Sequence, residues 1–526
     1  MNVDQGLQAH WPLVTDAHDV LGRYPGDTRG VVFRDGAAWF DGRNSVVEVP
    51  NSQEILGGSR EFSIAGWLHT APTLDHVLGD IVSKFDPSSR RGINFTLMNF
   101  AGVTSSQANH RNLFFGIDAG TAPSEWRDCG RPGNSIMVWA LCVHQGDLYA
   151  GTFETGKTEA GHVYRYAGEA QWVDCGAPAA CNAVTSLAVH EGHLYAAASH
   201  YRSSGSSIAE SENETPGGEV FRYEGGTQWA SCGVLPNPEA IFGLTVYRGQ
   251  LYASSMYKPA GVYRYEGGQN WQPCGQLSGR IAAMTVHRGY LYGSGYDVEH
   301  AGVYRYGGGD EWVDCGTPAG VTQTYSFAQH HGEMYVGTWP GGRVFRYDGE
   351  MGWEDTGRLG QEEEVMAMAV YNGKLYGGTL PLAEVYRYDG DGSWTRTGQL
   401  DTTPDVRYRR AWSMAVYQGK LFCGTLPAGR VYSMEAGCCV THDHAIAPGW
   451  CHIAAVRGKG QLALYVGGKQ AATSRMIEDG VLDVSNEQPL RIGFGTHDYF
   501  NGGMRDLRIY GRLLDSDEIL ALSKMK

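Results

Sequence analysis

The chain has 526 residues, a formal net charge of -15 at neutral pH and 19% charged residues. This acidic balance argues against duplex nucleic acid as a partner, because phosphate contacts need clustered Lys and Arg. No run of 18 apolar residues is present, so the sequence predicts no membrane span. The 74 glycines and 11% aromatic residues are typical of a turn-rich, all-β protein.

The N-terminus begins Met1-Asn-Val-Asp-Gln and lacks the basic segment and apolar core of a signal peptide. This favours a mature secreted or periplasmic chain whose signal was removed, with a cytoplasmic protein as the alternative. Residues 1–120 then carry short alternating runs at 38–42, 46–49 and 62–67, separated by Gly and Asp turns. Such runs predict the strands of a β-sandwich.

Between Trp126 and Tyr432 one pattern repeats seven times at a spacing of roughly 40–50 residues. Each copy has a short apolar strand, a His/Tyr-x-Gly turn, a Leu-Tyr strand, a Val-Tyr-Arg-Tyr strand and a Trp-x-x-Cys/Thr-Gly strand. Four short strands per repeat predict a seven-bladed β-propeller. The first Trp-x-x-Cys-Gly strand precedes the first apolar strand of the repeats. The last repeat ends without a Trp strand of its own. We therefore expect the Trp126 segment to complete the last blade and close the ring.

The repeated cysteines occupy one position in successive blades, where Thr356 and Thr397 replace them. Symmetry-related positions on separate blades lie beyond disulfide reach. We therefore interpret these cysteines as small, half-buried residues. Cys438, Cys439 and Cys451 at the C-terminal junction could supply one disulfide pair.

Residues 438–526 carry further alternating runs at 450–456, 462–466 and 500–510. Together with the Phe-Asp-Gly opening at 40–42, these runs resemble a laminin-G-like, concanavalin-type jelly roll. The resemblance implies one sandwich formed by 1–120 and 438–526, with a propeller at 121–437 inserted into it. Such an insertion is tolerated when the two ends of the insert lie close together.

The two rims of the propeller differ in their loops. The His/Tyr-x-Gly turns, including those at His144 and His190, are short and alike, which indicates scaffold. The opposite rim collects loops of variable length, and function concentrates in such loops. Tyr and His can move protons there, and Arg can bind a carboxylate. The catalytic candidates are His200, Tyr201, Tyr296 and His300, and the substrate-binding candidates are Arg202, Tyr257, Lys258, Trp339, Arg407, Tyr408 and Arg409. The acidic run at 362–364 is interpreted as solvated.

Propellers of this size occur among polysaccharide lyases, glycoside hydrolases and lectins, so the resemblance implies a carbohydrate ligand. The leading hypothesis is an enzyme that binds an acidic, uronate-containing polysaccharide in the propeller funnel and cleaves it by β-elimination. One alternative is a non-catalytic glycan- or protein-binding module of lectin or adhesion type, and a second is a glycoside hydrolase. None of these needs a cofactor. The laminin-G-like resemblance also implies a structural Ca²⁺, for which it points to Asp41 and Asp506.

Overall fold

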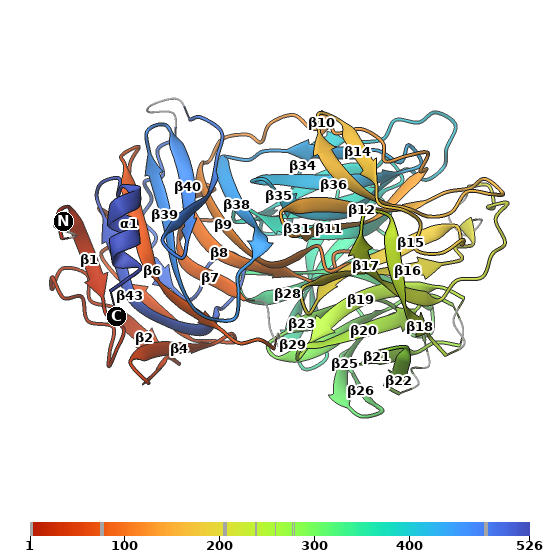
Figure 1. Ribbon diagram of the computed structural model, residues 1–526, viewed down its shortest axis with the longest axis horizontal. Coiled ribbons are helices and arrows are strands. Elements are labelled where there is room, and N and C mark those ends of the chain that lie inside the picture. The colour runs from red at the N-terminus through yellow and green to blue at the C-terminus, as the bar shows by residue number, and fades with distance from the viewer. Residues whose placement is uncertain are drawn as a thin grey trace.

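The computed structural model describes residues 4–73, 78–203, 208–236, 239–257, 259–275, 277, 279–477 and 482–525. The protein is all-β, as expected, with a sandwich beside a propeller-like body (Figure 1). Helix α1 (Ser516–Leu522) begins with a capping box between Asp515 and Glu518. Over the described ranges, helical structure is too short to span a bilayer.

Two sheets form the sandwich, and each combines strands from before and after the propeller. The first contains, in spatial order, β3 (Val32–Arg34), β4 (Ala37–Asp41), β43 (Asn501–Tyr510), β6 (Phe62–Thr70), β39 (Gly449–Gly458), β40 (Gln461–Val466) and β41 (Lys469–Thr473), with β1 (Leu7–Trp11) paired to β43. The second contains β2 (Asp27–Arg29), β5 (Val46–Val49), β42 (Leu490–Ile492), β7 (Gly79–Asp86), β8 (Arg91–Phe100), β9 (Asn109–Ala119) and β38 (Cys438–Ala445).

The sandwich core lies between these two sheets. Phe62 of the first sheet meets Phe115 of the second edge-to-face, with ring centroids 6.1 Å apart. At the edge of the second sheet, Cys438 pairs with Ile117 in an antiparallel ladder. The chain therefore leaves the sandwich and returns to it at adjacent positions.

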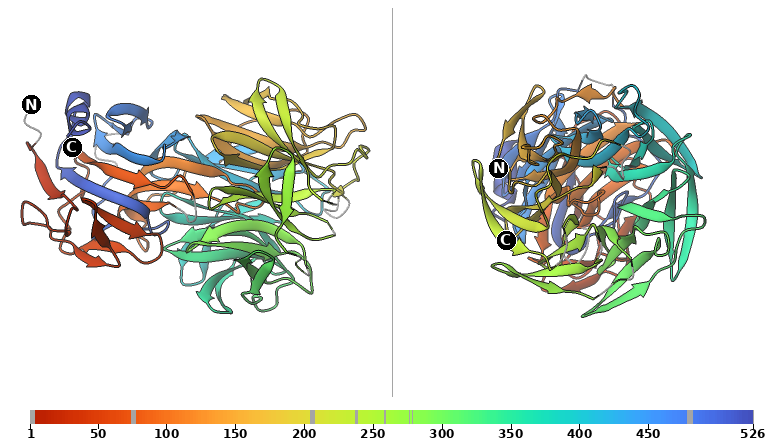
Figure 2. Two further views of the ribbon diagram at one scale, coloured as in Figure 1. Left: turned by 60° about the horizontal axis from the view of Figure 1, so that its bottom comes forward. Right: turned by 90° about the vertical axis from the view of Figure 1, so that its right-hand side faces the viewer.

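The remaining strands form antiparallel meanders arranged around one axis (Figure 2, right). Within the described residues, five sheets have four strands each. They are β19 (Ile241–Tyr247), β20 (Gln250–Ser255), β21 (Val262–Gly267) and β22 (Asn270–Pro273); β23 (Ile281–His287), β24 (Tyr290–Gly295), β25 (Val303–Gly308) and β26 (Glu311–Asp314); β27 (Gln323–His330), β28 (Glu333–Trp339), β29 (Arg343–Gly349) and β30 (Gly352–Arg358); β31 (Glu364–Tyr371), β32 (Lys374–Leu380), β33 (Glu384–Gly390) and β34 (Ser393–Gln399); and β35 (Arg410–Tyr417), β36 (Lys420–Leu426), β37 (Val431–Met434) and β10 (Arg127–Asp128).

An eight-stranded sheet contains two further meanders, joined by a single pair between Phe153 and Ala183. Its strands are β11 (Met137–His144), β12 (Asp147–Phe153), β13 (Val163–Gly168), β14 (Gln171–Asp174), β15 (Ala183–His190), β16 (His193–Ser199), β17 (Glu219–Gly225) and β18 (Gln228–Val234). We call β11, β15, β19, β23, β27, β31 and β35, the first strand of each meander, the inner strands.

The repeated Trp residues join neighbouring meanders by hydrogen bonds. The Nε1 of Trp172 donates to the carbonyl oxygen of Cys129 at 2.9 Å, and that of Trp394 donates to the carbonyl of Thr356 at 2.8 Å. Because the acceptor is a backbone carbonyl, Cys and Thr can replace each other at this position. All eleven cysteines of the chain are free thiols, so no pair forms among those at the C-terminal junction.

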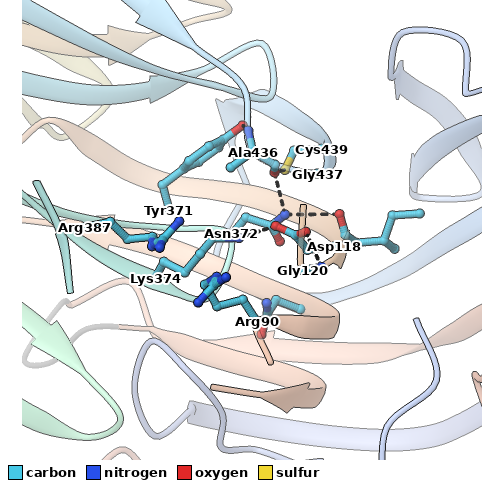
Figure 3. A network of polar contacts seen from close by, with 12 residues as sticks. Arg90, Asp118, Gly120, Tyr371, Asn372, Lys374, Arg387, Ala436, Gly437 and Cys439 are labelled. Carbon is cyan, nitrogen blue, oxygen red and sulfur yellow. Dashed lines mark hydrogen bonds and ion pairs between the residues drawn. The ribbon is translucent and has the colours of Figure 1, made fainter. Parts of the chain in front are cut away.

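The sandwich and the propeller meet through a buried polar network (Figure 3). Lys374, the first residue of β32 after the short turn from β31, forms an ion pair with Asp118 of β9. These side chains are only 4% and 1% exposed. Beside them, the Asn372 side chain donates to the carbonyl oxygens of Ile117 and Ala436. We call the rim formed by the short His/Tyr-x-Gly turns the short-turn rim. It is therefore the face of the propeller that is attached to the sandwich.

Strand β10 completes the meander of β35, β36 and β37, as the phase of the repeat predicts, because Arg127 pairs with Ser433. Deleting residues 121–130 should expose the edge of β37, and an open sheet edge promotes pairing between molecules. We expect a lower melting temperature and a larger apparent mass in size-exclusion chromatography. An unchanged melting temperature and elution volume would show that β10 does not close the ring.

Candidate functional site

A cavity of about 440 Å³ opens where the inner strands begin, and we call it the axial pocket. Every inner strand carries a β-bulge near its start, for example between Val138 and Ala140 of β11 and between Ala411 and Ser413 of β35. A bulge re-aims the side chain of its extra residue. The side chains at these bulges that line the pocket are Trp139, Phe242, Tyr325, Met366 and Trp412.

A second layer of the pocket consists of four polar residues, Arg280, Gln323, Glu364 and Arg410, which we call the polar ring. Three of them are the first residues of β27, β31 and β35, and Arg280 directly precedes β23. Each lies two residues before a bulge position, and side chains two apart in a strand share one face. The polar ring therefore faces the same axis as the bulge residues.

The opposite rim, whose loops vary in length, is called the variable rim. Its loops add tyrosine rings that, together with Trp139, Tyr325 and Trp412, form what we call the aromatic wall. Tyr201 follows β16 and contacts Trp139 edge-to-face, with centroids 4.4 Å apart. Tyr296 follows β24 and contacts Tyr325 at 5.2 Å. Trp139 also meets Trp412 at 5.2 Å. The rings thus brace one another from different meanders and form a preorganised aromatic surface.

The structure brings about half of the sequence-predicted site residues into the axial pocket. Those that line it are Tyr201, Arg202, Tyr257, Tyr296, Trp339 and Tyr408. Those outside its lining are His200, His300, Arg407 and Arg409. Lys258 lies outside the described residues.

Four of the candidate residues therefore do not contribute to the lining of the axial pocket. His200 and Tyr201 directly follow β16, and Tyr201 is the one that lines the pocket, where its ring packs against Trp139. His300 lies against Gly279 on another side of its loop. Arg407 stacks on Tyr408, and the backbone of Arg409 bonds to Pro381.

Sequence reasoning missed the polar ring as a set. All four residues precede the glycine of their own turn by the same number of residues, so a register of the repeats on Gly289, Gly332, Gly373 and Gly419 would have aligned them. Taken one repeat at a time, a polar residue at the start of an apolar strand resembles the end of the preceding loop. The repeat register is the signal that identifies it.

Glu362 and Glu364 correct the interpretation of 362–364 as a solvated run. Both are buried, and the Glu362 carboxylate accepts hydrogen bonds from Thr379 Oγ1 at 2.7 Å and from the Leu382 amide at 3.1 Å. Burial raises the pKa of Glu364 to about 7, against the opposing effects of the Tyr325 hydroxyl and the Arg410 charge. Its Oε1 has no hydrogen-bond partner among the described residues. Glu364 can therefore exchange a proton near neutral pH.

The arginines of the pocket are held over tyrosine rings. The guanidinium of Arg280 lies 4.6 Å from the centroid of Tyr296 and forms an ion pair with Asp297. That of Arg202 lies 4.9 Å from the ring of Tyr257. Stacking fixes the plane of each guanidinium, and its edge N–H groups bind a carboxylate here, Asp297 for Arg280 and Glu239 for Arg202. Burial raises the pKa of Tyr296 to about 12, so this hydroxyl stays protonated at neutral pH.

His144 and His190 lie away from the axial pocket, as expected for the rim of short turns. They line a second cavity of about 580 Å³ where the short-turn rim meets the sandwich. Burial lowers the pKa of His144 to about 4, so its imidazole is neutral at pH 7. These histidines therefore serve as controls for ligand binding.

The two residues expected to bind calcium do not fit a shared ion. The Asp41 carboxylate caps a tight turn by accepting from the amides of Arg43, Asn44 and Ser45. The Asp506 carboxylate is engaged by a ring nitrogen of His10 at 2.7 Å and by Arg508 at 2.9 Å. Neither offers the converging oxygen donors that Ca²⁺ requires. The structural calcium ion itself stays a prediction, checked by melting curves with and without EDTA.

Replacing Glu364 by Gln should stabilise the protein at high pH. A carboxyl whose pKa is raised on folding, here from 4.5 to about 7, binds its proton more tightly in the folded state. Stability therefore falls as pH rises between these two values, by up to about 3 kcal/mol. We expect Glu364→Gln to melt higher than the wild type at pH 8 and by a much smaller margin at pH 5. Equal margins at both pH values would contradict the assigned pKa.

Residues 426–520 match the family model Laminin_G_3, concanavalin A-like lectin/glucanases superfamily. This match covers the C-terminal flank and supports the laminin-G-like resemblance. No curated protein matches the sequence.

Solved structures with a similar arrangement include virginiamycin B lyase from Staphylococcus aureus, which is 9% identical, with 59% of this chain and 99% of that chain covered and a TM-score of 0.46. YCF48 bound to D1 peptide is 12% identical, with 60% and 100% covered and a TM-score of 0.42. The WD40 β-propeller domain of Doa1 is 10% identical, with 59% and 97% covered and a TM-score of 0.41. These similarities are too low to support an inference about function.

Proposed function

We propose that the axial pocket binds a carbohydrate. The observation that carries this proposal is the combination of an aromatic wall with the polar ring in one cavity of about 440 Å³. Small-ligand pockets typically combine apolar and aromatic walls with a few polar groups that fix orientation. A sugar ring suits this arrangement because its C–H face packs on an aromatic ring and its hydroxyls bond to the polar groups.

An acidic sugar is the preferred ligand in this proposal. Among the described lining residues, Arg202, Arg280 and Arg410 carry positive charge and Glu364 is the one carboxyl group. Glu239 and Asp297, which pair with Arg202 and Arg280, lie outside the lining. Arginine binds a carboxylate through two parallel N–H groups. A uronate therefore matches the charge of the pocket better than a neutral hexose does.

The groups present also suit β-elimination. In this scheme Glu364 removes the proton on the carbon next to the uronate carboxylate, and an arginine stabilises the negative charge that develops there. The carbon–oxygen bond to the leaving sugar breaks as the double bond forms. A tyrosine hydroxyl, such as that of Tyr296 or Tyr325, protonates the departing oxygen. The pKa of Glu364, about 7, lets it act as the base near neutral pH.

The two alternative functions, glycoside hydrolysis and binding without catalysis, make different demands on the site. A glycoside hydrolase normally uses two carboxyl groups on opposite sides of the scissile bond. Glu364 lacks a second carboxyl partner among the described residues that line the pocket, which disfavours hydrolysis. A lectin-like module would bind the same glycans without forming product.

We also propose the number of blades and the boundaries of the two domains. We count the eight-stranded sheet as two blades, which gives a propeller of seven blades over 121–437, inserted in a sandwich of 1–120 and 438–526. A polysaccharide ligand suits a mature chain that is secreted or periplasmic.

The test is calorimetry with polygalacturonate, alginate, hyaluronan and heparan sulfate, with absorbance of the unsaturated uronate recorded in parallel. We expect at least one polymer to bind and to yield absorbing product. Arg410→Ala should weaken binding by about 2–5 kcal/mol if this arginine pairs with the carboxylate in the pocket. Arg305→Ala is the matched control, since Arg305 also stacks on a tyrosine but outside the pocket. Binding without product supports the lectin alternative, and no binding removes the proposal.

A further inference from the structure

A loop of the sandwich enters the propeller from the side opposite the axial pocket. It spans residues 101–108, between β8 and β9, and we call it the plug loop. Ala108 accepts a hydrogen bond from the Val143 amide at 2.9 Å, and Gly102 accepts one from the Phe327 amide at 2.9 Å. The plug loop thus bonds to inner strands on different sides of the axis, β11 and β27.

Its remaining contacts complete the circle. The amide of Gln107 donates to Leu187 of β15 at 3.1 Å, and Ser105 accepts from the Leu244 amide of β19 at 3.2 Å. Ala101 accepts from the Thr285 hydroxyl of β23 at 3.0 Å. The Thr104 hydroxyl lies within bonding distance of the carbonyl oxygens of Met366 in β31 and Trp412 in β35. Every inner strand therefore contacts this one loop.

The plug loop fits the channel closely. Thr104 and Ser105 are 1% and 2% exposed, and Gln107 is fully buried. Gly102 has a φ of +74°, and a Cβ there would lie 2.9 Å from the Met284 carbonyl oxygen. Because the plug loop is buried and is hydrogen-bonded to every inner strand, it leaves no passage for a sugar chain along the propeller axis.

The floor of the axial pocket lies directly over this plug. Met366 and Trp412 line the pocket, and the Thr104 hydroxyl lies within hydrogen-bond distance of the carbonyl oxygens of both. The pocket is therefore closed at its inner end and open at the variable rim. A sugar inside a polymer carries two glycosidic links on different sides of its ring, whereas a terminal sugar carries one. A closed pocket admits the terminal sugar and excludes the internal one.

We propose that the axial pocket recognises the end of a uronate chain and does not bind internal segments. This inference rests on the proposed function and adds to it the position on the polymer. If cleavage occurs, it proceeds from a chain end and releases short products from the start of the reaction.

The test uses whichever of the four polymers named above binds, as a long preparation and after partial depolymerisation of the same mass. We expect the amount of protein bound per mass of polymer to rise in proportion to the number of chain ends. We also expect Arg410→Ala to lose this binding and Arg305→Ala to retain it. If the amount of protein bound per mass of polymer did not depend on chain length, end recognition would be overturned, while carbohydrate binding would still stand. End-dependent binding that survives in Arg410→Ala would place the end-binding site elsewhere and overturn the inference. No binding of any polymer would remove the proposed function together with this inference.

Discussion

Lys374→Ala should destabilise the protein by about 3–5 kcal/mol, because it leaves a buried carboxylate without its counter-ion. The partner is Asp118 on the sandwich strand β9, and both side chains are almost fully buried (Figure 3). Desolvation lowers the pKa of Lys374, against the attraction of Asp118, which shows that burial is the larger effect on this group. The measurement is chemical denaturation followed by tryptophan fluorescence.

The next repeat supplies a matched control. Lys420 occupies the same place after its turn glycine and pairs with Glu435 at 3.3 Å, but these side chains are 35% and 24% exposed. An exposed pair of this kind contributes less than about 1 kcal/mol. Lys420→Ala should therefore have a small effect. The double variant Lys374→Met with Asp118→Leu should recover most of the loss, because it removes both buried charges together. If Lys374→Ala and Lys420→Ala lowered the free energy of unfolding equally, the buried pair at the junction would contribute no more stability than an exposed pair.

The fragment 1–120 should not fold on its own. Its longest strand in the first sheet, β6, has β43 on one side and β39 on the other, and both come from the C-terminal flank. Without them β6 loses its ladder on both edges, and the apolar face beneath it is exposed to water. We expect aggregated or unfolded product by circular dichroism and size-exclusion chromatography.

Joining 1–120 to 438–526 through a short Gly/Ser linker should instead give a folded sandwich. Ile117 and Cys438 already face each other in the ladder between β9 and β38, so the linker closes a hairpin. The plug loop is then exposed, and we expect lower solubility than that of the full chain. A well-dispersed amide spectrum for 1–120 alone, or none for the joined flanks, would contradict a single sandwich interrupted by the propeller.

The architecture was predictable because its signals are local and repeated. The turn glycine, the Leu-Tyr pair and the Trp recur together in each repeat, at a spacing of roughly 40–50 residues, so the repeat alone indicates a propeller. The position of Trp126 ahead of any inner strand likewise predicts the pairing of β10 with β37. These signals need no knowledge of contacts between distant residues.

The site was predictable only in part, since rim loops can be assigned from the repeat but side-chain directions cannot. Tyr201 and His200 are neighbours in sequence, yet only the tyrosine lines the pocket. Glu364 resembles a solvated residue next to Glu362 and Glu363, and its burial follows from the packing of separate meanders. The plug loop carries no signal of its own, because its partners are mainly backbone groups of strands far away in the sequence.

Binding of a chain end in the axial pocket can be tested by a crystal structure of the protein with a bound uronate hexasaccharide, prepared from the polymer that binds. We expect one terminal sugar in the axial pocket, with its carboxylate within hydrogen-bond distance of Arg280 or Arg410 and its ring against the aromatic wall. The rest of the chain should extend outward over the variable rim. A hexasaccharide bound to the sandwich instead, or lying across the rim with the axial pocket empty, would contradict it.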